Sequence, residues 1–445
     1  MTLFGAFRVC GVFPRVCHAC GASLLQQSNI KALFLGFVME CCKAVWFNSA
    51  NFPKTEVGSG KSGAPVQTLE NLEMKKTLVA LAALAAFGAQ AQSSVTIDGQ
   101  FDAGLASINY KGAKTTGVLN NGSTTSQINF RGVQDMGGGL KATFRVETDW
   151  NTVSNNGNTG AKKADGTVAA ASSFANGEIR GGLTSATFGS IDFGAINNAQ
   201  LDAYLTGQPY GTAIGGGFRG IFVSDAATAV NGSVVRFDNS VRYITPAFSG
   251  ISASVLQVKK NSVANSTNFS TTFGNYDYAG VSEYSLRYNN GPINAIYGVT
   301  KQDLTGTEGA TVADATLKTL GANYTYGDFK FFLLNQTAGN NLVAGGTSLD
   351  RKASMYSVAY TMGQHVFTAG LASATNSIVA ASNTGKSKMS SLGYDYNLNK
   401  TSSVYARYES IKDEGGIIPN NSQQAAPAAG ETTRSRTAVG LRIGF

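Results

Sequence analysis

Residues 434–445 read Arg434-Ser435-Arg436-Thr437-Ala438-Val439-Gly440-Leu441-Arg442-Ile443-Gly444-Phe445. From Val439 onward every second residue is large and apolar, and arginines stand at positions of the other parity. Because the side chains of an extended strand point alternately to its two faces, this stretch predicts a strand with one apolar face and one charged face. A single such strand also fits a soluble sandwich, so the pattern becomes informative only where it recurs.

The alternation recurs along most of the chain. In one segment Leu140 and Phe144 share a parity, and Arg145 and Glu147 share the other. We predict sixteen strands: Ser94–Tyr110, Thr125–Gly132, Leu140–Trp150, Phe174–Leu183, Ala186–Gly194, Ser233–Ile244, Ile251–Val258, Tyr278–Tyr288, Ile293–Lys301, Ala315–Thr325, Asp328–Gln336, Arg351–Thr361, His365–Ala374, Lys386–Tyr396, Lys400–Ser410 and Thr433–Phe445.

The connectors between these strands are alternately short and long. The long, polar ones cover residues 111–124, 151–173, 195–232, 259–277, 302–314, 337–350, 375–385 and 411–432. A membrane barrel with an even number of strands has short turns at one rim and long loops at the other. The Greek-key connections of a soluble sandwich have no such asymmetry, so the connectors favour the barrel.

The charged parity indicates which face of the barrel is wet. In the segment 233–244, Arg236, Asp238 and Arg242 share one parity, and residues 278–288 place Glu283 and Arg287 together. So many charges of both signs do not fit a small dry core, and they fit a water-filled lumen. No apolar run in residues 92–445 approaches the roughly 20 residues of a membrane helix. The sequence therefore predicts an all-β fold, a 16-stranded antiparallel transmembrane β-barrel.

The composition agrees with many short strands joined by tight turns. The 445 residues include 53 Gly, 17 Tyr and 25 Phe but only 8 Pro, and charged residues make up 14%, against roughly 25% in soluble domains. All five cysteines precede residue 74: Cys10, Cys17, Cys20, Cys41 and Cys42. The Cys17–Cys20 pair has a CxxC spacing but lacks the second pair of a zinc site. We therefore expect no metal and no cofactor.

Residues 74–91 have the three parts of a secretory signal peptide. Met74-Lys75-Lys76 is a basic start, Thr77 to Gly88 is an apolar run, and Ala89-Gln90-Ala91 is a cleavage motif. Residues 1–73 are then predicted to be a misassigned start or a pro-region, and residues 92–445 the barrel. Removal of residues 1–91 takes away eight basic and four acidic residues, so the formal charge falls from +8 to +4.

The last strand resembles the closing strand of the Gram-negative general porins, in particular the β-proteobacterial type of Neisseria and the Burkholderiales. The resemblance is carried by Val439–Phe445 together with Ser94–Gly99, Phe130–Leu140 and Arg236–Gly250. It implies passive diffusion of small hydrophilic solutes through a homotrimer in the outer membrane. It also implies contacts with membrane lipid and lipopolysaccharide, and assembly by the barrel-assembly machinery, with Phe445 as part of the signal. No nucleic-acid partner is implied.

The resemblance further implies that the third long loop, residues 195–232, folds into the lumen and faces a ladder of wall arginines. The loop carries Asp202, Asp225 and Arg219. The wall candidates are Arg131, Arg145, Arg236, Arg242, Arg287, Arg407 and Arg442. An alternative remains open, in which these arginines only neutralise lumen carboxylates such as Glu147, Asp238 and Glu283.

The chain also departs from the family pattern, because Gln127, Asp192 and Ala195 stand where the resemblance leads us to expect basic residues. We therefore expect a modest preference for anions, milder than in a fully arginine-lined channel.

Other functions have less support in the sequence. A substrate-selective channel of the same architecture is the main alternative. A hydrolase would have to use His365, since residues 92–445 contain no other histidine and no cysteine. The glycines in residues 211–220 are not followed by the Lys-Ser/Thr of a phosphate-binding loop. An adhesin or structural barrel would have a plugged lumen, which single-channel conductance separates from an open one.

Overall fold

The structure, a computed structural model, describes residues 93–110, 113–152, 174–218, 220–222, 235–259, 280–303, 312–342, 349–378, 383–414 and 433–445. All of them belong to one unit, Ala89–Phe445. The predictions for residues 1–73 and 74–91 lie outside these ranges, and the domain division stays a prediction.

The described residues form seventeen strands and one helix in the order of the chain. The strands are β1 (Ser94–Tyr110), β2 (Ala113–Asn120), β3 (Gln127–Gly137), β4 (Leu140–Asp149), β5 (Ile179–Ser185), β6 (Gly189–Asn197), β7 (Arg236–Ile244), β8 (Ile251–Val258), β9 (Gly280–Asn290), β10 (Ile293–Asp303), β11 (Val312–Tyr326), β12 (Phe329–Leu342), β13 (Leu349–Met362), β14 (His365–Ile378), β15 (Asn383–Asn397), β16 (Ser403–Glu414) and β17 (Thr433–Gly444), and the helix α3 (Ala199–Thr206) follows β6.

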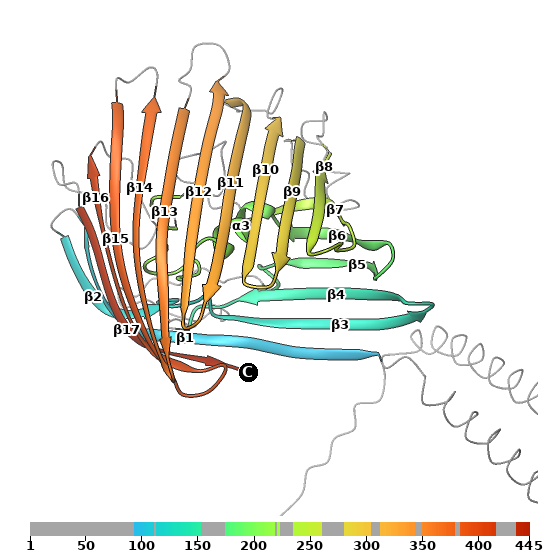
Figure 1. The fold of residues 1–445 in the computed structure, drawn as a ribbon, viewed down its shortest axis with the longest axis horizontal. Helices are drawn as coiled ribbons and strands as arrows, with labels where there is room; N and C mark the ends of the chain where they lie inside the picture. Colours follow the sequence, from blue (N-terminus) through green and yellow to red (C-terminus); the bar gives the residue numbers. More distant parts are fainter. Residues whose placement is uncertain are drawn as a thin grey trace, which may run out of the picture. The chain divides into compact units, whose positions relative to one another are not determined.

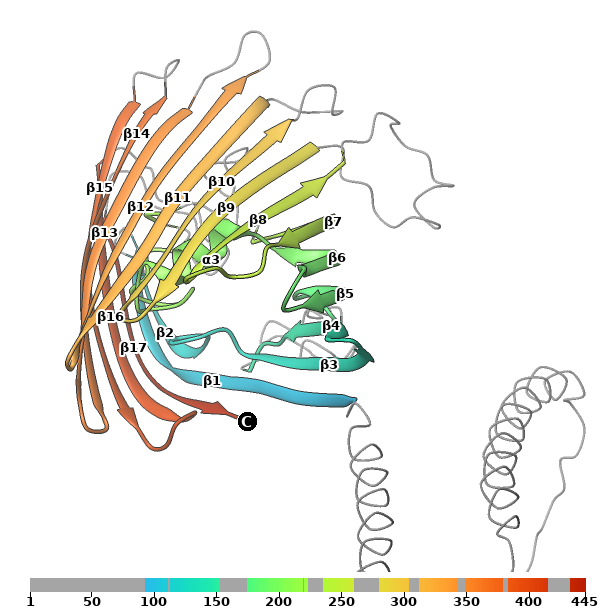
Figure 2. The ribbon, with the colours of Figure 1, turned by 45° about the vertical axis from the view of Figure 1, so that its right-hand side comes forward.

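From β3 to β17 each strand pairs antiparallel with the next, and β1 pairs with both β3 and β17. The ring of sixteen strands is therefore closed, as the sequence predicted. Figures 1 and 2 show these strands as a curved wall with α3 on its inner side. Within the described ranges, no helix has both the length and the hydropathy that a helical membrane crossing requires.

The strand β2 is a difference from the prediction, which placed residues 111–124 in a loop. β2 pairs with residues 103–110 of β1, while β3 pairs with residues 94–100 of the same edge. Part of the first long connector thus continues the sheet along β1, beyond the segment of β1 that pairs with β3. Its β-branched residues Thr115, Thr116 and Val118 suit a strand and explain why this short segment pairs.

The two parities of β17 lie as the sequence predicted. Val439 is 54% exposed on the outer face, whereas Arg434 is 0% exposed on the inner face. The same outward exposure holds for Leu105, Phe193 and Leu286 on other strands. The apolar parity therefore faces out of the barrel, the reverse of a soluble barrel, in which it would form the core.

The parity prediction is wrong at the start of β7. A β-bulge separates the pairs Gly194–Ser240 and Ile196–Phe237, and Asn239 has a φ of 53°. Two residues of β7 then face one residue of β6, so the alternation slips by one position. Phe237 is consequently buried against Ile196, and Asp238 lies in a groove on the outer face. Asp238 is therefore not a lumen carboxylate.

The chain end closes the barrel, which confirms the predicted pairing of the last strand with the first. The backbone N–H of Gly99 donates to the Phe445 oxygen at 3.0 Å, and the N–H of Phe445 donates to the Gly99 oxygen at 3.1 Å. The Phe445 ring covers Gly99, where a Cβ would approach its Cζ to 2.6 Å. Glycine at this position thus makes room for the terminal aromatic ring.

Candidate functional site

The described part of the third long connector, residues 198–218 and 220–222, lies against the inner face of the wall. It begins with α3, whose first turn is capped by the Asn198 side chain accepting from Leu201 N at 2.9 Å. The helix contacts β10 and β11. Gly321 on β11 allows this approach, because a Cβ there would collide with the backbone oxygen of Ala203.

The helical start of the loop is fixed by hydrogen bonds to inward-facing polar residues. The Ala199 N–H donates to Glu283 Oε1 at 2.6 Å, and Thr300 donates to Glu283 Oε2 at 2.6 Å. The Gln200 amide donates to Thr300 Oγ1 at 2.9 Å, and Asn323 Nδ2 donates to the Thr206 oxygen at 2.9 Å. Because these groups are buried, each bond also satisfies a polar atom that would destabilise the fold if it had no hydrogen-bond partner.

The distal part of the loop is fixed by buried charges. Glu409 lies between Arg434, at 3.1 Å, and Arg436, at 2.9 Å, and its Oε2 accepts from the Gly215 N–H at 3.1 Å. Arg351 donates to the backbone oxygen of Gly220 at 2.9 Å. Removing one partner of such a buried cluster costs about 3–5 kcal/mol, since the other charges lose their compensation. The cluster therefore holds the loop against β16 and β17.

Apolar packing completes the contact between loop and wall. Aromatic and aliphatic side chains of the loop meet inward-facing residues of β12 to β16, and together they form one buried cluster. Its members are Tyr204, Tyr210, Ile221, Phe222, Leu334, Ala353, Met355, Ala372, Ala374, Met389 and Ile411. Apolar inward residues on these strands thus serve the loop, and the inner wall is not uniformly polar.

A turn after β2 lies beside the tip of the loop. Asp102 on β1 accepts hydrogen bonds from the backbone N–H groups of Gly122, Ser123 and Thr124 and from the Tyr405 hydroxyl. These four donors hold the turn inside the barrel. At its end Thr125 Oγ1 lies 3.0 Å from Thr212 Oγ1 of the loop, so the two segments are in contact inside the barrel.

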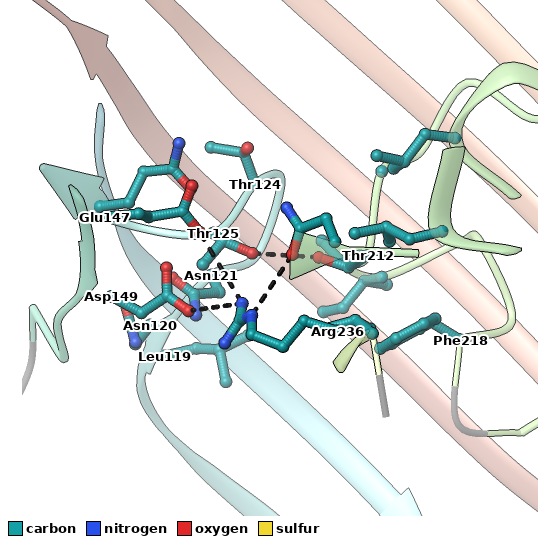
Figure 3. A pocket seen from close by; sticks show the side chains of 18 of the residues that line it. Leu119, Asn120, Asn121, Thr124, Thr125, Glu147, Asp149, Thr212, Phe218 and Arg236 are labelled. Atoms are coloured by element: carbon teal, nitrogen blue, oxygen red, sulfur yellow. Dashed lines mark hydrogen bonds and ion pairs between the residues drawn. The ribbon is translucent and has the colours of Figure 1, made fainter. Parts of the chain in front are cut away.

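Between this turn, β4 and the loop lies a cavity of about 560 Å³. Charged residues of both signs line it, together with amides, hydroxyls and several apolar side chains. The lining includes Asn120, Asn121, Thr125, Gln127, Arg145, Glu147, Asp149, Asn197, Leu201, Asp202, Leu205, Thr212, Phe218, Arg236 and Arg436. Figure 3 shows Arg236 pointing toward Glu147 and Asp149.

The wall beside the cavity carries a network of ion pairs from β4 to β7. Arg145 pairs with Glu147 and, at 2.9 Å, with Glu178. Asp192 accepts from both Arg180 and Arg242 at 2.8 Å. Asp192 stands where the resemblance led us to expect a basic residue, so the network is closer to neutral than an uninterrupted arginine ladder.

Arg236 has a looser arrangement than its neighbours. Its Nη1 donates to the Asn176 oxygen at 2.6 Å, and its Nε donates to Asn197 Oδ1 at 3.3 Å. Its Nη2 lies 3.8 Å from Glu147 and 3.9 Å from Asp149, beyond hydrogen-bond distance. Arg236 therefore retains a donor directed at the cavity.

On the loop, Asp202 pairs with Arg287 of β9 at 3.3 Å, and about half of its side chain, 52%, is exposed. The surrounding protein raises the pKa of the Asp202 carboxyl, while Arg287 and Arg242 act in the opposite direction. Asp202 consequently gains its proton at a higher pH than an ordinary aspartate.

The other predicted site residues on the inner face do not line the cavity, although Arg131 is the cross-strand partner of Arg145. Arg131 pairs with Asp98 at 2.7 Å, and Arg407 pairs with Asp395 at 2.9 Å. Arg442 has no carboxylate within 4.0 Å among the described residues. Asp225 and Arg219 lie outside the described residues.

Sequence reasoning missed several inward-facing charges in this region. Asp149 shares the parity of Arg145 and Glu147, and Arg180 shares that of Glu178, so alternation was a signal for both. Arg434 and Arg436 carried the same signal in the terminal strand, but Glu409 and Asp102 are recognisable only through their partners in space. The sequence pattern gives the face of a residue and not its neighbour across the sheet.

Among the described residues, neither a histidine nor a cysteine lines the cavity. His365 lies on β14 beside Phe367 and Tyr394, whose hydroxyl is 2.9 Å from its Nδ1. Within the described ranges no three His, Cys, Asp or Glu residues are grouped as metal ligands would be.

Comparisons with known proteins agree with this geometry. Residues 77–416 match the family described as Gram-negative porin. The chain is 28% identical over 386 residues to outer membrane porin protein 32 of Delftia acidovorans, covering 84% of this chain and 100% of the relative. It is 30% identical over 284 residues to an outer membrane porin protein of Bordetella pertussis, covering 58% of this chain and 67% of the relative.

Solved structures share the fold. An anion-selective porin from Comamonas acidovorans superposes with a TM-score of 0.60 at 24% identity, covering 80% of this chain and 100% of that one. An OmpT structure from Vibrio cholerae, described as a trimer form, superposes with a TM-score of 0.55 at 16% identity, covering 79% of this chain and 99% of that one. With its closed wall and apolar outer face, the chain belongs to the Gram-negative porin family and is an integral outer-membrane channel protein, not an enzyme.

Proposed function

We propose that this porin is a general-diffusion channel, which passes small hydrophilic solutes and ions down their gradients. The observation that carries the proposal is the cavity of about 560 Å³ between the loop and the wall, bordered by charged and amide side chains. Polar walls replace part of the hydration of a passing solute, and the closed backbone hydrogen bonding keeps lipid outside.

We place the constriction at this cavity, with Arg145 and Arg236 on the wall and Asp202 on the loop, and we include Arg242 and Arg287, which line an adjoining pocket with Asp202. Arg131, Arg407 and Arg442 lie elsewhere on the inner face and act on ions before or after the narrow region. This assignment is supported by the contacts of the loop with β9 to β17, which hold Asp202 opposite β4 and β7.

We further propose a modest preference for anions. Most wall arginines are paired with carboxylates, so the preference depends on the basic groups left over. Arg442 and Lys330 are inward-facing and have no carboxylate within 4.0 Å among the described residues. A narrow passage between walls of low dielectric constant concentrates the field of such charges. The anion-selective porin from Comamonas acidovorans, which shares the fold, makes this sign of selectivity a natural one to test.

The active form is proposed to be a homotrimer, in contact with outer-membrane lipid and lipopolysaccharide and inserted by the barrel-assembly machinery. The band of exposed apolar side chains on the outer face suits both lipid and neighbouring subunits.

The direct test is single-channel recording in planar lipid bilayers with purified protein. We expect stepwise current increases whose size scales with KCl concentration and is nearly linear with voltage. Protein boiled in detergent is the control and should give no steps. Native protein that inserts into the bilayer without conducting would contradict the proposal and favour a plugged, structural barrel.

A further inference from the structure

The cavity beside the loop has an apolar side that a passage for hydrophilic solutes does not require. Leu201 and Leu205 lie one helical turn apart on α3, so they share a face, and both line the cavity. Leu205 is 43% exposed. The opposite face of the helix, with Ala203 and Tyr204, is buried against the wall.

Three further apolar side chains, Leu119, Phe218 and Ile108, border the same cavity. We call the group formed by Leu119, Leu201, Leu205 and Phe218 the apolar shelf. Leu205 is exposed and the other three are half-buried, and apolar groups that border one cavity inside a polar passage mark a surface that binds apolar parts of a ligand. A volume of about 560 Å³ falls within the range of small-molecule sites, roughly 300–1,000 Å³.

Opposite charges with spare hydrogen-bonding capacity border the same space. Arg236 Nη2 lies beyond hydrogen-bond distance of Glu147 and Asp149, at 3.8 and 3.9 Å. The Asp149 side chain is 31% exposed, its carboxylate accepts no side-chain hydrogen bond from the described residues, and its Oδ2 is the oxygen on the side of Arg236. A lone anion near Arg236 would be repelled by both carboxylates, and a lone cation near Asp149 would be repelled by Arg236. A zwitterion satisfies both groups.

We propose that the constriction contains a binding subsite for small zwitterions with an apolar side chain, that is, apolar α-amino acids or the ends of short peptides. The ligand carboxylate accepts from Arg236, its ammonium donates to Asp149, and its side chain lies on the apolar shelf. The proposal rests on the function as a diffusion channel and names a solute class that this channel retains.

The test compares leucine with asparagine as blockers of the KCl current in planar bilayers. The two carry the same charged groups and differ in an isobutyl against a carboxamide side chain. We expect leucine to reduce the current saturably, with a half-blocking concentration about fivefold lower than that of asparagine, the effect of partly burying an apolar side chain. Equal blocking in a conducting channel would refute the subsite and leave the channel function intact. A protein without current would refute the channel function itself.

Variants separate the two halves of the subsite. Leu205→Asn should abolish the advantage of leucine, whereas Leu205→Met, which keeps an apolar side chain, should retain it.

For the charged half, 4-methylpentanoate lacks the ammonium and should block more weakly than leucine. Asp149→Asn should weaken the block by leucine and strengthen that by 4-methylpentanoate, because the carboxylate of this anion is no longer repelled by Asp149. Equal potency of the two solutes on the wild type would refute the zwitterion assignment, and this comparison stands even if a variant fails to assemble.

Discussion

At the scale of single residues, the inner wall is a set of compensated charges rather than a row of free arginines. Glu409 is fully buried between Arg434 and Arg436, and Asp192 joins Arg180 to Arg242. Buried charges need such partners, because the free energy lost when a charge leaves water can exceed the free energy gained from a single ion pair. The alternative left open by the sequence, that arginines neutralise lumen carboxylates, thus describes much of the wall, and selectivity depends on a few residues.

Asp202 makes this selectivity dependent on pH. Partial removal from water inside the barrel raises the pKa of its carboxyl, so acidification protonates it at a higher pH than an ordinary aspartate. Protonation removes a negative charge from the loop, and the preference for anions should rise as the pH falls. Reversal potentials in a KCl gradient, measured from neutral to acidic pH, would show this step. Asp202→Asn should have the higher preference at neutral pH, coincide with the wild type at acidic pH and lack the step, whereas matching pH profiles for variant and wild type would contradict the role of Asp202.

At the scale of elements, the loop is held by contacts that the sequence pattern does not reveal. α3 has only eight residues, too few for a stable isolated helix, and its stability comes from Glu283, Thr300 and Asn323 on the wall. Gly321 is the position at which the wall admits the helix.

Gly321→Ala should therefore move α3 away from β11, because the new Cβ would collide with the Ala203 backbone oxygen, which has no flexible end to give way. A displaced loop changes the width of the passage, so we expect an altered single-channel conductance and noisier open current. Gly181→Ala is the matched control, since the nearest atom to its Cβ would be 3.8 Å away. Identical current traces for wild type and Gly321→Ala would show that the loop position does not set the conductance.

The sixteen wall strands were predictable because one face of each must be apolar and the other polar. Apolar and polar residues therefore alternate along each strand, with a period of two. The bulge at Asn239 was not predictable from the sequence, since one inserted residue reverses the faces of the strand without changing its composition. The ion pairs were not predictable either. Arg145 meets Glu178 only through the register of β4 against β5, and register is set by the whole sheet.

At the scale of the whole molecule, closure of the ring depends on the last residues of the chain. Strand edges expose unpaired backbone groups, which lipid cannot satisfy, and the pairing of β17 with β1 removes them. Phe445 completes this seam on the outer face beside Gly99.

Deletion of Phe445 should consequently lower the yield of heat-modifiable trimer on gels of unboiled outer membranes. The deletion removes both backbone hydrogen bonds to Gly99 and an aromatic group proposed to be read during assembly. Phe248→Ala, which removes an aromatic side chain that is 82% exposed in a turn, is the control and should assemble normally. An unchanged trimer yield after deletion would argue against an assembly role for Phe445.

The net electrostatic field in the channel is likewise a property of the whole molecule. It is the small remainder that is left after most positive and negative charges of the wall have cancelled in ion pairs. Arg442 and Lys330 lie on the inner face without a carboxylate within 4.0 Å among the described residues, so they contribute to that remainder. We expect reversal potentials at low KCl to show an anion preference that shrinks toward 1 M, where the screening length is about 3 Å. Arg442→Gln combined with Lys330→Gln should move the reversal potential toward zero, whereas Lys352→Gln, at an exposed site beside Asp350, should leave it nearly unchanged. A wild-type channel that prefers cations at low salt would mean that the carboxylates of the wall outweigh these two groups.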